Sequence, residues 1–304
     1  MNSKKSNWLF LTIILVHLAV VVFLLLAGSR ISFGILTNLM VSEGIIMAPA
    51  LLFLAFAGKG RGRILGFGKI KLSTFFMIVL FTFLIMPLVT VLNAVSMFFT
   101  ENAVASMEQD ITGAAFPMML FMIGIFGPFC EEFVFRGVLY SGYKRSGSRL
   151  GAIFLSALLF GLMHMNVNQA IYAFAIGILL ALLVEATGSL WASMVCHMVF
   201  NSEQVCLMYL SEKILSALPG QEMAAAELTT ESLMAALSVY LMIAAVTTPI
   251  ACCVLAWIAK NEKREAALKG IWAQRGEAKE YLVSVPLVIA VVLCLAYMSL
   301  EFIL

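Results

Sequence analysis

The chain has 304 residues, of which 62% are hydrophobic and 12% are charged, and its mean hydropathy is +1.03. These values exclude an ordinary soluble globular domain, in which apolar and charged residues are far more balanced. The formal net charge of +2 does not indicate a nucleic-acid partner, and we expect none, because membrane topology and anionic lipid account for the basic residues. The composition predicts an all-α polytopic membrane protein, a single integral membrane domain over residues 1–304.

Nine apolar stretches follow one another along the chain, most of them near the ~20 residues that span a hydrocarbon core as a helix. They cover residues 8–28, 35–57, 73–99, 115–140, 150–165, 169–187, 189–210, 232–258 and 281–303. The stretch 150–165 is the shortest, so we expect a bundle of eight or nine transmembrane helices around an intramembrane cavity. Lys4 and Lys5 resemble the start of a secretory signal, but the apolar stretch after them is too long for one, and we expect it to be retained.

The basic residues predict the orientation, because Lys and Arg in short loops tend to stay on the cytoplasmic side. With nine crossings and a cytoplasmic N-terminus, the inside segments contain Lys4, Lys5, Lys59, Arg61, Arg63, Lys69, Lys71, Lys144, Arg145, Arg149, Lys260, Lys263, Arg264, Lys269, Arg275 and Lys279. The outside loops then contain only Arg30 and Lys213. We therefore expect a multi-pass protein of the cell membrane, in contact with the lipid bilayer, with its C-terminus outside.

The first polar pattern within an apolar stretch is Glu131-Glu132-Phe-Val-Phe-Arg136. Ionisable groups inside a bilayer are costly, and they usually have a function. Glu132 and Arg136 lie four residues apart, so they can form an ion pair on one face of a helix. We expect them to have a supporting role, with Arg136 reaching toward the cytoplasm as the alternative. Glu131 points elsewhere and is free for proton transfer.

Two further patterns have one-turn spacing: Phe160 with His164, and His197 with Asn201. The first places a ring and an imidazole on one helical face. The second supplies two hydrogen-bond donors, which an anionic tetrahedral intermediate requires. Each pattern alone is more typical of a hydrogen bond between membrane helices. Together with the two glutamates, they favour a catalytic site.

These three motifs, in this order on separate apolar stretches, resemble those of the CPBP family of intramembrane endopeptidases. The resemblance covers about residues 131–201 and includes Thr187-Gly188-Ser189-Leu190 before the last motif. This family contains the type II CAAX prenyl proteases and bacterial relatives linked to bacteriocin processing and self-immunity. The resemblance implies a protease core at about residues 115–210.

The resemblance also implies a role for each matching residue. It assigns catalytic roles to Glu131, His164, His197 and Asn201, and supporting roles to Glu132, Arg136 and Phe160. Glu131 would act as general base on a water molecule, and His164 would hold or relay a proton. His197 and Asn201 would form the oxyanion hole.

A zinc ion is the alternative to a metal-free site. Family members are often described as metalloproteases, and Glu131, His164 and His197 could supply three ligands with a fourth position open for water. However, the sequence has no His-Glu-x-x-His helix, and the resemblance implies that the best understood members activate water with glutamate alone. We therefore favour a site without a metal or other cofactor.

The expected substrate is a membrane-associated peptide or protein, prenylated or of leader type, in a cavity open toward the cytoplasmic leaflet. One alternative is a catalytically silent protein of the same fold that binds or protects a partner. Another is a proton- or ion-coupled transporter, although the sequence shows no inverted repeats. Its relay would use Glu43, Glu131, His164, Glu185 and His197.

Overall fold

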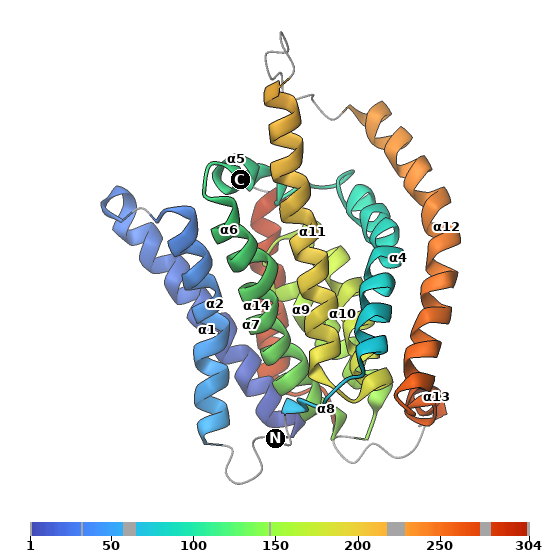
Figure 1. Ribbon diagram of the computed structural model, residues 1–304. Coiled ribbons are helices and arrows are strands. Elements are labelled where there is room, and N and C mark those ends of the chain that lie inside the picture. Colours follow the sequence, from blue (N-terminus) through green and yellow to red (C-terminus); the bar gives the residue numbers. More distant parts are fainter. Residues whose placement is uncertain are drawn as a thin grey trace.

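The computed structural model describes residues 2–31, 33–56, 65–145, 147–217, 229–273 and 281–302, and every regular element within these ranges is helical. The long helices run side by side between two ends of the molecule (Figure 1). Several basic residues of the orientation argument, Lys59, Arg61, Arg63, Arg275 and Lys279, lie outside the described residues. The prediction of an all-α polytopic membrane protein is confirmed.

Each of the nine predicted stretches coincides with a helix or a helical run. The long helices are α1 (Ser3–Ala27), α2 (Ile35–Ala55), α4 (Leu72–Ser96), α9 (Arg149–Met163), α10 (Val167–Thr187), α11 (Leu190–Ala217), α12 (Thr230–Asn261) and α14 (Val285–Ser299). One further run, Phe116–Lys144, is built from α6 (Phe116–Met119), η3 (Leu120–Phe126), α7 (Gly127–Glu132), η4 (Phe133–Tyr140) and α8 (Ser141–Lys144). Short elements are η1 (Gly28–Arg30), η2 (Ala105–Met107), α5 (Glu108–Thr112), α13 (Glu265–Ala273) and η5 (Leu300–Phe302).

Among the described residues, seven helices are long and apolar enough to cross a membrane. Two others fall short for different reasons. Helix α9 has only 15 residues, and α11 carries polar side chains, including His197 and Asn201, along an otherwise apolar helix. The chain is thus a multi-pass membrane protein, with a helix count near the predicted eight or nine.

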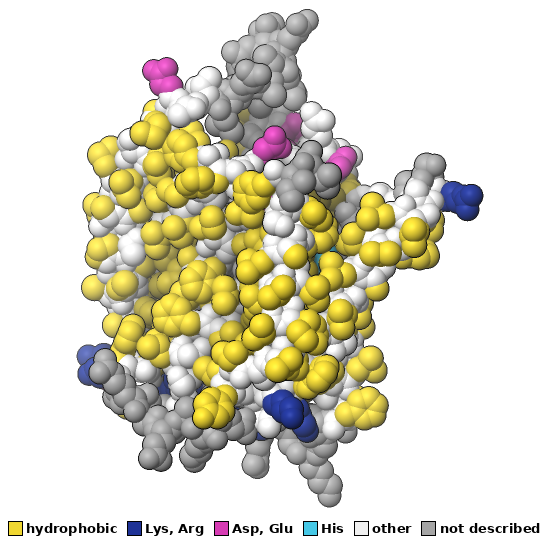
Figure 2. Space-filling model, turned by 180° about the vertical axis from the view of Figure 1, so that it is seen from behind, with side chains coloured by type: hydrophobic (Ala, Val, Ile, Leu, Met, Phe, Trp, Pro, Cys, Tyr) yellow, Lys and Arg dark blue, Asp and Glu magenta, His cyan; other side chains and the backbone are white. Residues whose placement is uncertain are grey.

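The two ends of the bundle differ in charge. The N-terminus, α8 and α13 lie at one end, which we call the basic end, and α5 and the C-terminus lie at the other, which we call the acidic end (Figure 1). In Figure 2 the acidic side chains in view lie at the upper end, whereas most of the basic side chains in view lie at the lower end. A broad apolar belt separates them, as expected for a protein surrounded by lipid tails.

The run that carries the two glutamates is not a regular α-helix, because η3 and η4 on either side of α7 are π-helical. The N–H of Gly127 bonds to the carbonyl of Met122, five residues back. With the same spacing the carbonyl of Ile123 would need the N–H of Pro128, which proline lacks. The side-chain amide of Asn201 donates to this carbonyl instead, at 3.2 Å. Single π-turns are frequent at functional sites.

Two glycines let α9 and α10 pack closely as a hairpin. A Cβ on Gly161 would lie 2.6 Å from the carbonyl oxygen of Ala170, and one on Gly177 would lie 2.9 Å from the Cα of Ala157. The chain turns at Met165, whose φ of 52° lies in the left-handed region. His164, which ends α9, directly precedes this turn.

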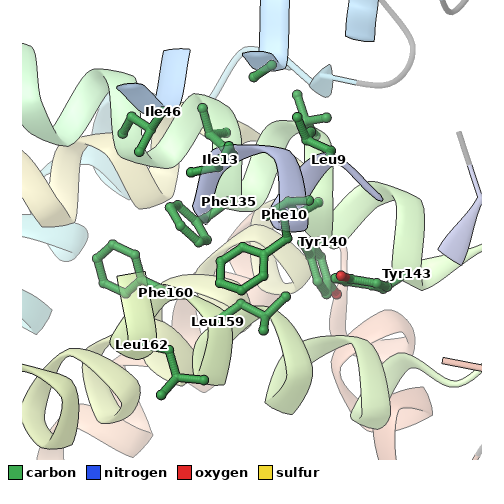
Figure 3. Packing of buried hydrophobic residues seen from close by; sticks show 14 of the residues in the cluster. Leu9, Phe10, Ile13, Ile46, Phe135, Tyr140, Tyr143, Leu159, Phe160 and Leu162 are labelled. Atoms are coloured by element: carbon green, nitrogen blue, oxygen red, sulfur yellow. The ribbon is translucent and has the colours of Figure 1, made fainter. Parts of the chain in front are cut away.

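Large buried side chains from several helices pack together in one cluster (Figure 3). The cluster includes Leu9, Phe10, Ile13, Phe135, Tyr140, Tyr143 and Leu159, each at most 1% exposed. The hydroxyl of Tyr143 donates to Asn7 at 2.8 Å, and that of Tyr140 donates to Glu185 at 2.8 Å. Lys144 also pairs with Glu185. The cluster is therefore a packed core in which the side chains of Tyr140, Tyr143 and Glu185 have polar partners.

We predict that Gly161→Ala destabilises the protein by about 1–3 kcal/mol, because the added methyl group would push the two backbones of the hairpin apart. Thermal unfolding of the purified protein in detergent measures this change. Gly44→Ala is the matched control: no atom lies within 4 Å of its Cβ position, so improved helix propensity should stabilise it by up to ~1 kcal/mol. An unfolding temperature for Gly161→Ala at or above that of the unchanged protein would show that the hairpin is not closely packed.

Candidate active site

All four residues predicted to be catalytic line a single cavity of about 540 Å³ between the helices. Glu131 comes from α7, His164 from the end of α9, and His197 and Asn201 from α11. The volume lies within the range of small-molecule and peptide side-chain sites. Because α9 has only 15 residues, it ends within the bundle. His164, at its end, therefore lies beside the same cavity as the other three residues. The structure thus brings together an acid, two imidazoles and an amide from three separate segments.

The side chain of Glu132 connects two of these segments. It is fully buried, and its Oε1 accepts from Nη1 of Arg136 at 2.7 Å and from Nδ1 of His197 at 3.1 Å. The expected ion pair is therefore present, and the alternative position for Arg136 is wrong, because its side chain is 1% exposed rather than reaching the cytoplasmic surface. The contact with His197 was not predicted. It gives Glu132 a part in the site beyond fixing its own helix.

The bond to Glu132 sets the protonation of His197. A carboxylate that is already paired with a guanidinium can only accept hydrogen bonds, so Nδ1 of His197 carries the hydrogen. The other ring nitrogen, Nε2, lies 3.5 Å from Oε2 of Glu131. This distance is longer than a hydrogen bond but within ion-pair range. The imidazole of His197 therefore bridges the two consecutive glutamates.

Several charged side chains gather around His197. Glu131 and Glu132 supply two negative charges, and Arg136 supplies one positive charge. Uncompensated charge is costly in a low-dielectric interior, so the contacts among these side chains matter for stability. The side chain of Glu131 is 22% exposed, whereas His197 is 5% exposed. Both side chains line the cavity, and Glu131 is the more exposed of the two.

Phe160 packs against three of the polar groups. The guanidinium carbon of Arg136 lies 4.2 Å from the centre of its ring, a cation–π distance. The rings of His164 and His197 meet the same ring edge-on, with centroids 5.1 Å and 5.7 Å away. Phe160 is 2% exposed. Its place in the motif therefore reflects contacts with groups on α9, α11 and η4.

His164 has a fixed tautomer as well. Its Nδ1 lies 2.9 Å from the carbonyl oxygen of Phe160, and because a carbonyl oxygen only accepts, Nδ1 donates. In the neutral ring the Nε2 lone pair is then free to accept a proton. The residue is half-buried and lines the cavity. It is suited to hold a proton, as the family resemblance implies.

Asn201 has a structural bond in addition to its place at the cavity. Its donation to the carbonyl of Ile123 uses one of the two amide hydrogens. This is the helix–helix hydrogen bond that the sequence pattern alone would favour. The second amide hydrogen leaves Asn201 with donor capacity for a ligand in the cavity, beside which it lies half-buried.

Glu43 of α2 is a member of the site that sequence reasoning assigned only to a transport relay. It lines the cavity, accepts a hydrogen bond from the thiol of Cys130 and interacts electrostatically with Glu131. Its Oε1 lies 3.2 Å from the position that a Cβ on Gly127 would take. Its Oε2 is buried without a hydrogen-bond partner among the described residues. The one available signal was that Glu43 is the only acidic residue in the stretch 35–57.

A zinc site would require Glu131, His164 and His197 to converge on one point. No three His, Cys, Asp or Glu side chains in the described part of the chain form a group that could hold a metal ion. His164 and His197 pack on the ring of Phe160, and a zinc ion requires its ligands within ~2.0–2.3 Å of one point. Such a convergence of Glu131, His164 and His197 is not found in the described part of the chain.

An all-α multi-pass membrane protein with a polar cavity between its helices is the class that fold and site define. Residues 113–202 match the family model described as type II CAAX prenyl endopeptidase Rce1-like. The resemblance predicted from the three motifs is thereby confirmed. All seven predicted site residues lie within the matched range.

One curated protein is similar over part of the chain. The chain is 26% identical over 88 residues to the protein named "Putative membrane peptidase YdiL" of Bacillus subtilis (strain 168). The match covers 29% of this chain and 36% of that protein. No solved structure matches the chain. The family match over residues 113–202 therefore covers the helices that carry the site.

We predict that Arg136→Met destabilises the protein by roughly 3–5 kcal/mol, because it leaves the buried carboxylate of Glu132 with an uncompensated charge. Removing both charges, in Glu132→Gln with Arg136→Met, should recover much of the lost stability. Thermal unfolding of the two single variants and the double variant, analysed as a double-mutant cycle, measures the coupling. Additive losses in the double variant would contradict the ion pair.

Proposed function

We propose that this protein is an intramembrane endopeptidase of the CAAX type, which hydrolyses peptide bonds of membrane-associated peptides with water activated by Glu131. The family match supports the class of activity, and the bridge from Glu132 through His197 to Glu131 at the cavity wall supports the chemistry. That bridge is the single observation that carries the proposal. In the proposed mechanism, a proton acceptor and a hydrogen-bond donor act side by side at the cavity wall.

Glu131 acts as the general base. Its carboxylate faces the cavity and takes a proton from a water molecule as the oxygen of that water attacks the peptide carbonyl. The distance of 3.5 Å to His197 leaves Glu131 without a tight hydrogen bond to that ring. Catalytic contacts of this kind often shorten only once substrate is bound.

His197 and Asn201 stabilise the oxyanion that the attack creates. In the proposed mechanism His197 is protonated, so that its Nε2–H and the second amide hydrogen of Asn201 can both donate from α11 at the cavity wall. Their orientation is fixed in advance by Glu132 and by the carbonyl of Ile123. Donors held in place before the reaction lower the barrier more effectively than mobile ones. His164 then receives the proton of the water from Glu131 and passes it to the nitrogen of the leaving amine as the C–N bond breaks, which returns Glu131 to its carboxylate form.

A proton or ion relay receives less support from the structure. The proposed relay needed Glu185 in line with the other residues. Instead, Glu185 is fully buried at the basic end, bonded to Tyr140 and paired with Lys144. It does not line the cavity. The relay residues therefore fall into two separate groups among the described residues.

We predict that Glu131→Gln and His164→Ala each reduce peptide hydrolysis by at least ~10²-fold, because each removes a group that transfers a proton. The assay uses purified protein in lipid vesicles with a pool of candidate peptides, including prenylated and leader-type ones. Glu231→Gln, at the exposed start of α12, is the matched control and should hydrolyse the same peptides at the unchanged rate.

A strong chelator added to the same assay separates the two mechanisms. Hydrolysis that is unaffected by the chelator agrees with the proposal, and hydrolysis that the chelator abolishes would favour a metal. Full activity of Glu131→Gln would refute the role of Glu131. Binding of peptides without any hydrolysis by the unchanged protein would instead identify a catalytically silent member of the fold.

A further inference from the structure

The cavity extends from the candidate active site toward one end of the bundle only. Glu131, Phe135, Phe160 and His197 form its inner wall. From there the lining continues along the later half of α4, the first turns of α10 and the later half of α11, and it reaches η2 and α5. These elements lead to the acidic end (Figure 1). Whether this agrees with the expected opening toward the cytoplasmic leaflet depends on which end of the bundle faces the cytoplasm.

Packing explains why the cavity does not extend the other way. On the side of the basic end the buried cluster of Figure 3 occupies the space between α1, η4 and α9. Beyond it, Glu185 is bonded to Tyr140 and paired with Lys144, and Arg264 donates to the carbonyl of Glu185 at 3.4 Å. Side chains thus fill the route from Glu131 to the basic end.

The outer part of the cavity carries the polar groups that an extended peptide needs. Asn93, Asn102, Gln169 and Gln204 line it together with Glu108. Peptide backbone that is neither helical nor paired is tolerated within a membrane only where such groups or water satisfy it. Four amide side chains can both donate to and accept from a backbone.

Charge at the same end selects the sign of the peptide. Glu108 lines the outer part of the cavity. Other exposed or half-buried acidic residues at this end, outside the lining, are Glu101, Asp110, Glu203, Glu212, Glu231 and Glu301. The described basic residues toward this end are Lys213 of α11 and Arg30, which lies apart in η1. A cavity mouth lined by one sign of charge attracts ligands of the other sign.

The distribution of basic residues assigns a side of the membrane to each end. Lys and Arg concentrate at the basic end, and loops rich in these residues stay in the cytoplasm. We propose that the cavity opens on the extracytoplasmic side and that the substrate is an extended, basic peptide segment supplied from that side. This proposal rests on the proposed function for its substrate, whereas the direction of the opening stands without it. A tail presented in the cytoplasm would meet the packed half of the bundle.

Labelling of intact cells tests the direction without any assay of activity. Glu101→Cys places a thiol at an exposed position of the acidic end, and Lys69→Cys places one at an exposed position of the basic end. With a membrane-impermeant thiol reagent, we expect labelling above the background of the native cysteines for Glu101→Cys in intact cells. Lys69→Cys should react only after permeabilisation. The reverse pattern would overturn the proposal.

Hydrolysis in sealed vesicles tests the route of the substrate. A basic, membrane-impermeant peptide with a fluorescence quencher should be cleaved by right-side-out vesicles without detergent, and by inverted vesicles only after detergent. Cleavage by intact inverted vesicles alone would overturn the proposal. Absence of cleavage even in detergent, with the labelling as expected, would refute the proposed function and the substrate but leave the direction of the opening intact.

A charge reversal at the mouth tests the sign of the peptide. Glu108→Lys should lower kcat/KM for the basic peptide by roughly fivefold, the size of one charge contact in water, and high salt should abolish the difference. The control Glu231→Lys carries the same reversal outside the cavity lining and should have little effect. An equal loss with a neutral peptide would contradict electrostatic selection.

Discussion

The buried carboxylate of Glu132 is the constraint on which the rest of the site depends. One oxygen accepts from both Arg136 and His197, so a single group joins the π-helical run to α11. Breaking this pair would leave charge without compensation in the interior. Because the carboxylate fixes Nδ1 of His197 as a donor, it also determines which ring nitrogen faces Glu131. The contacts of Glu132 thus both stabilise the site and orient the imidazole of His197.

Phe160 and the hairpin of α9 and α10 complete the arrangement. The ring of Phe160 stacks under the guanidinium of Arg136 and meets both imidazoles edge-on. One aromatic side chain thus contacts Arg136, His164 and His197. The close approach at Gly161 holds that ring in place. The short length of α9 ends the helix inside the bundle, where its last side chain reaches the cavity. An apolar scaffold therefore positions polar groups that lipid could not accommodate.

The sequence was sufficient for the helices and for the ion pair between Glu132 and Arg136, since stretch length, apolar composition and one-turn spacing are local properties. It was not sufficient for features that depend on contacts between distant segments. Glu43 joins the cavity from α2, and His197 meets Glu132 from another helix. The π-helical turns next to Pro128 and the direction of the cavity likewise depend on how whole helices pack.

The most direct test of this account is the protonation of His197 by nitrogen NMR of ¹⁵N-histidine-labelled protein in lipid nanodiscs, in which only three histidines contribute signals. The account predicts an Nδ1 of His197 that carries a hydrogen and is strongly hydrogen-bonded, and a clear change of that signal in Glu132→Gln. An unprotonated Nδ1, or a signal that Glu132→Gln does not alter, would contradict the claim that Glu132 orients the catalytic imidazole.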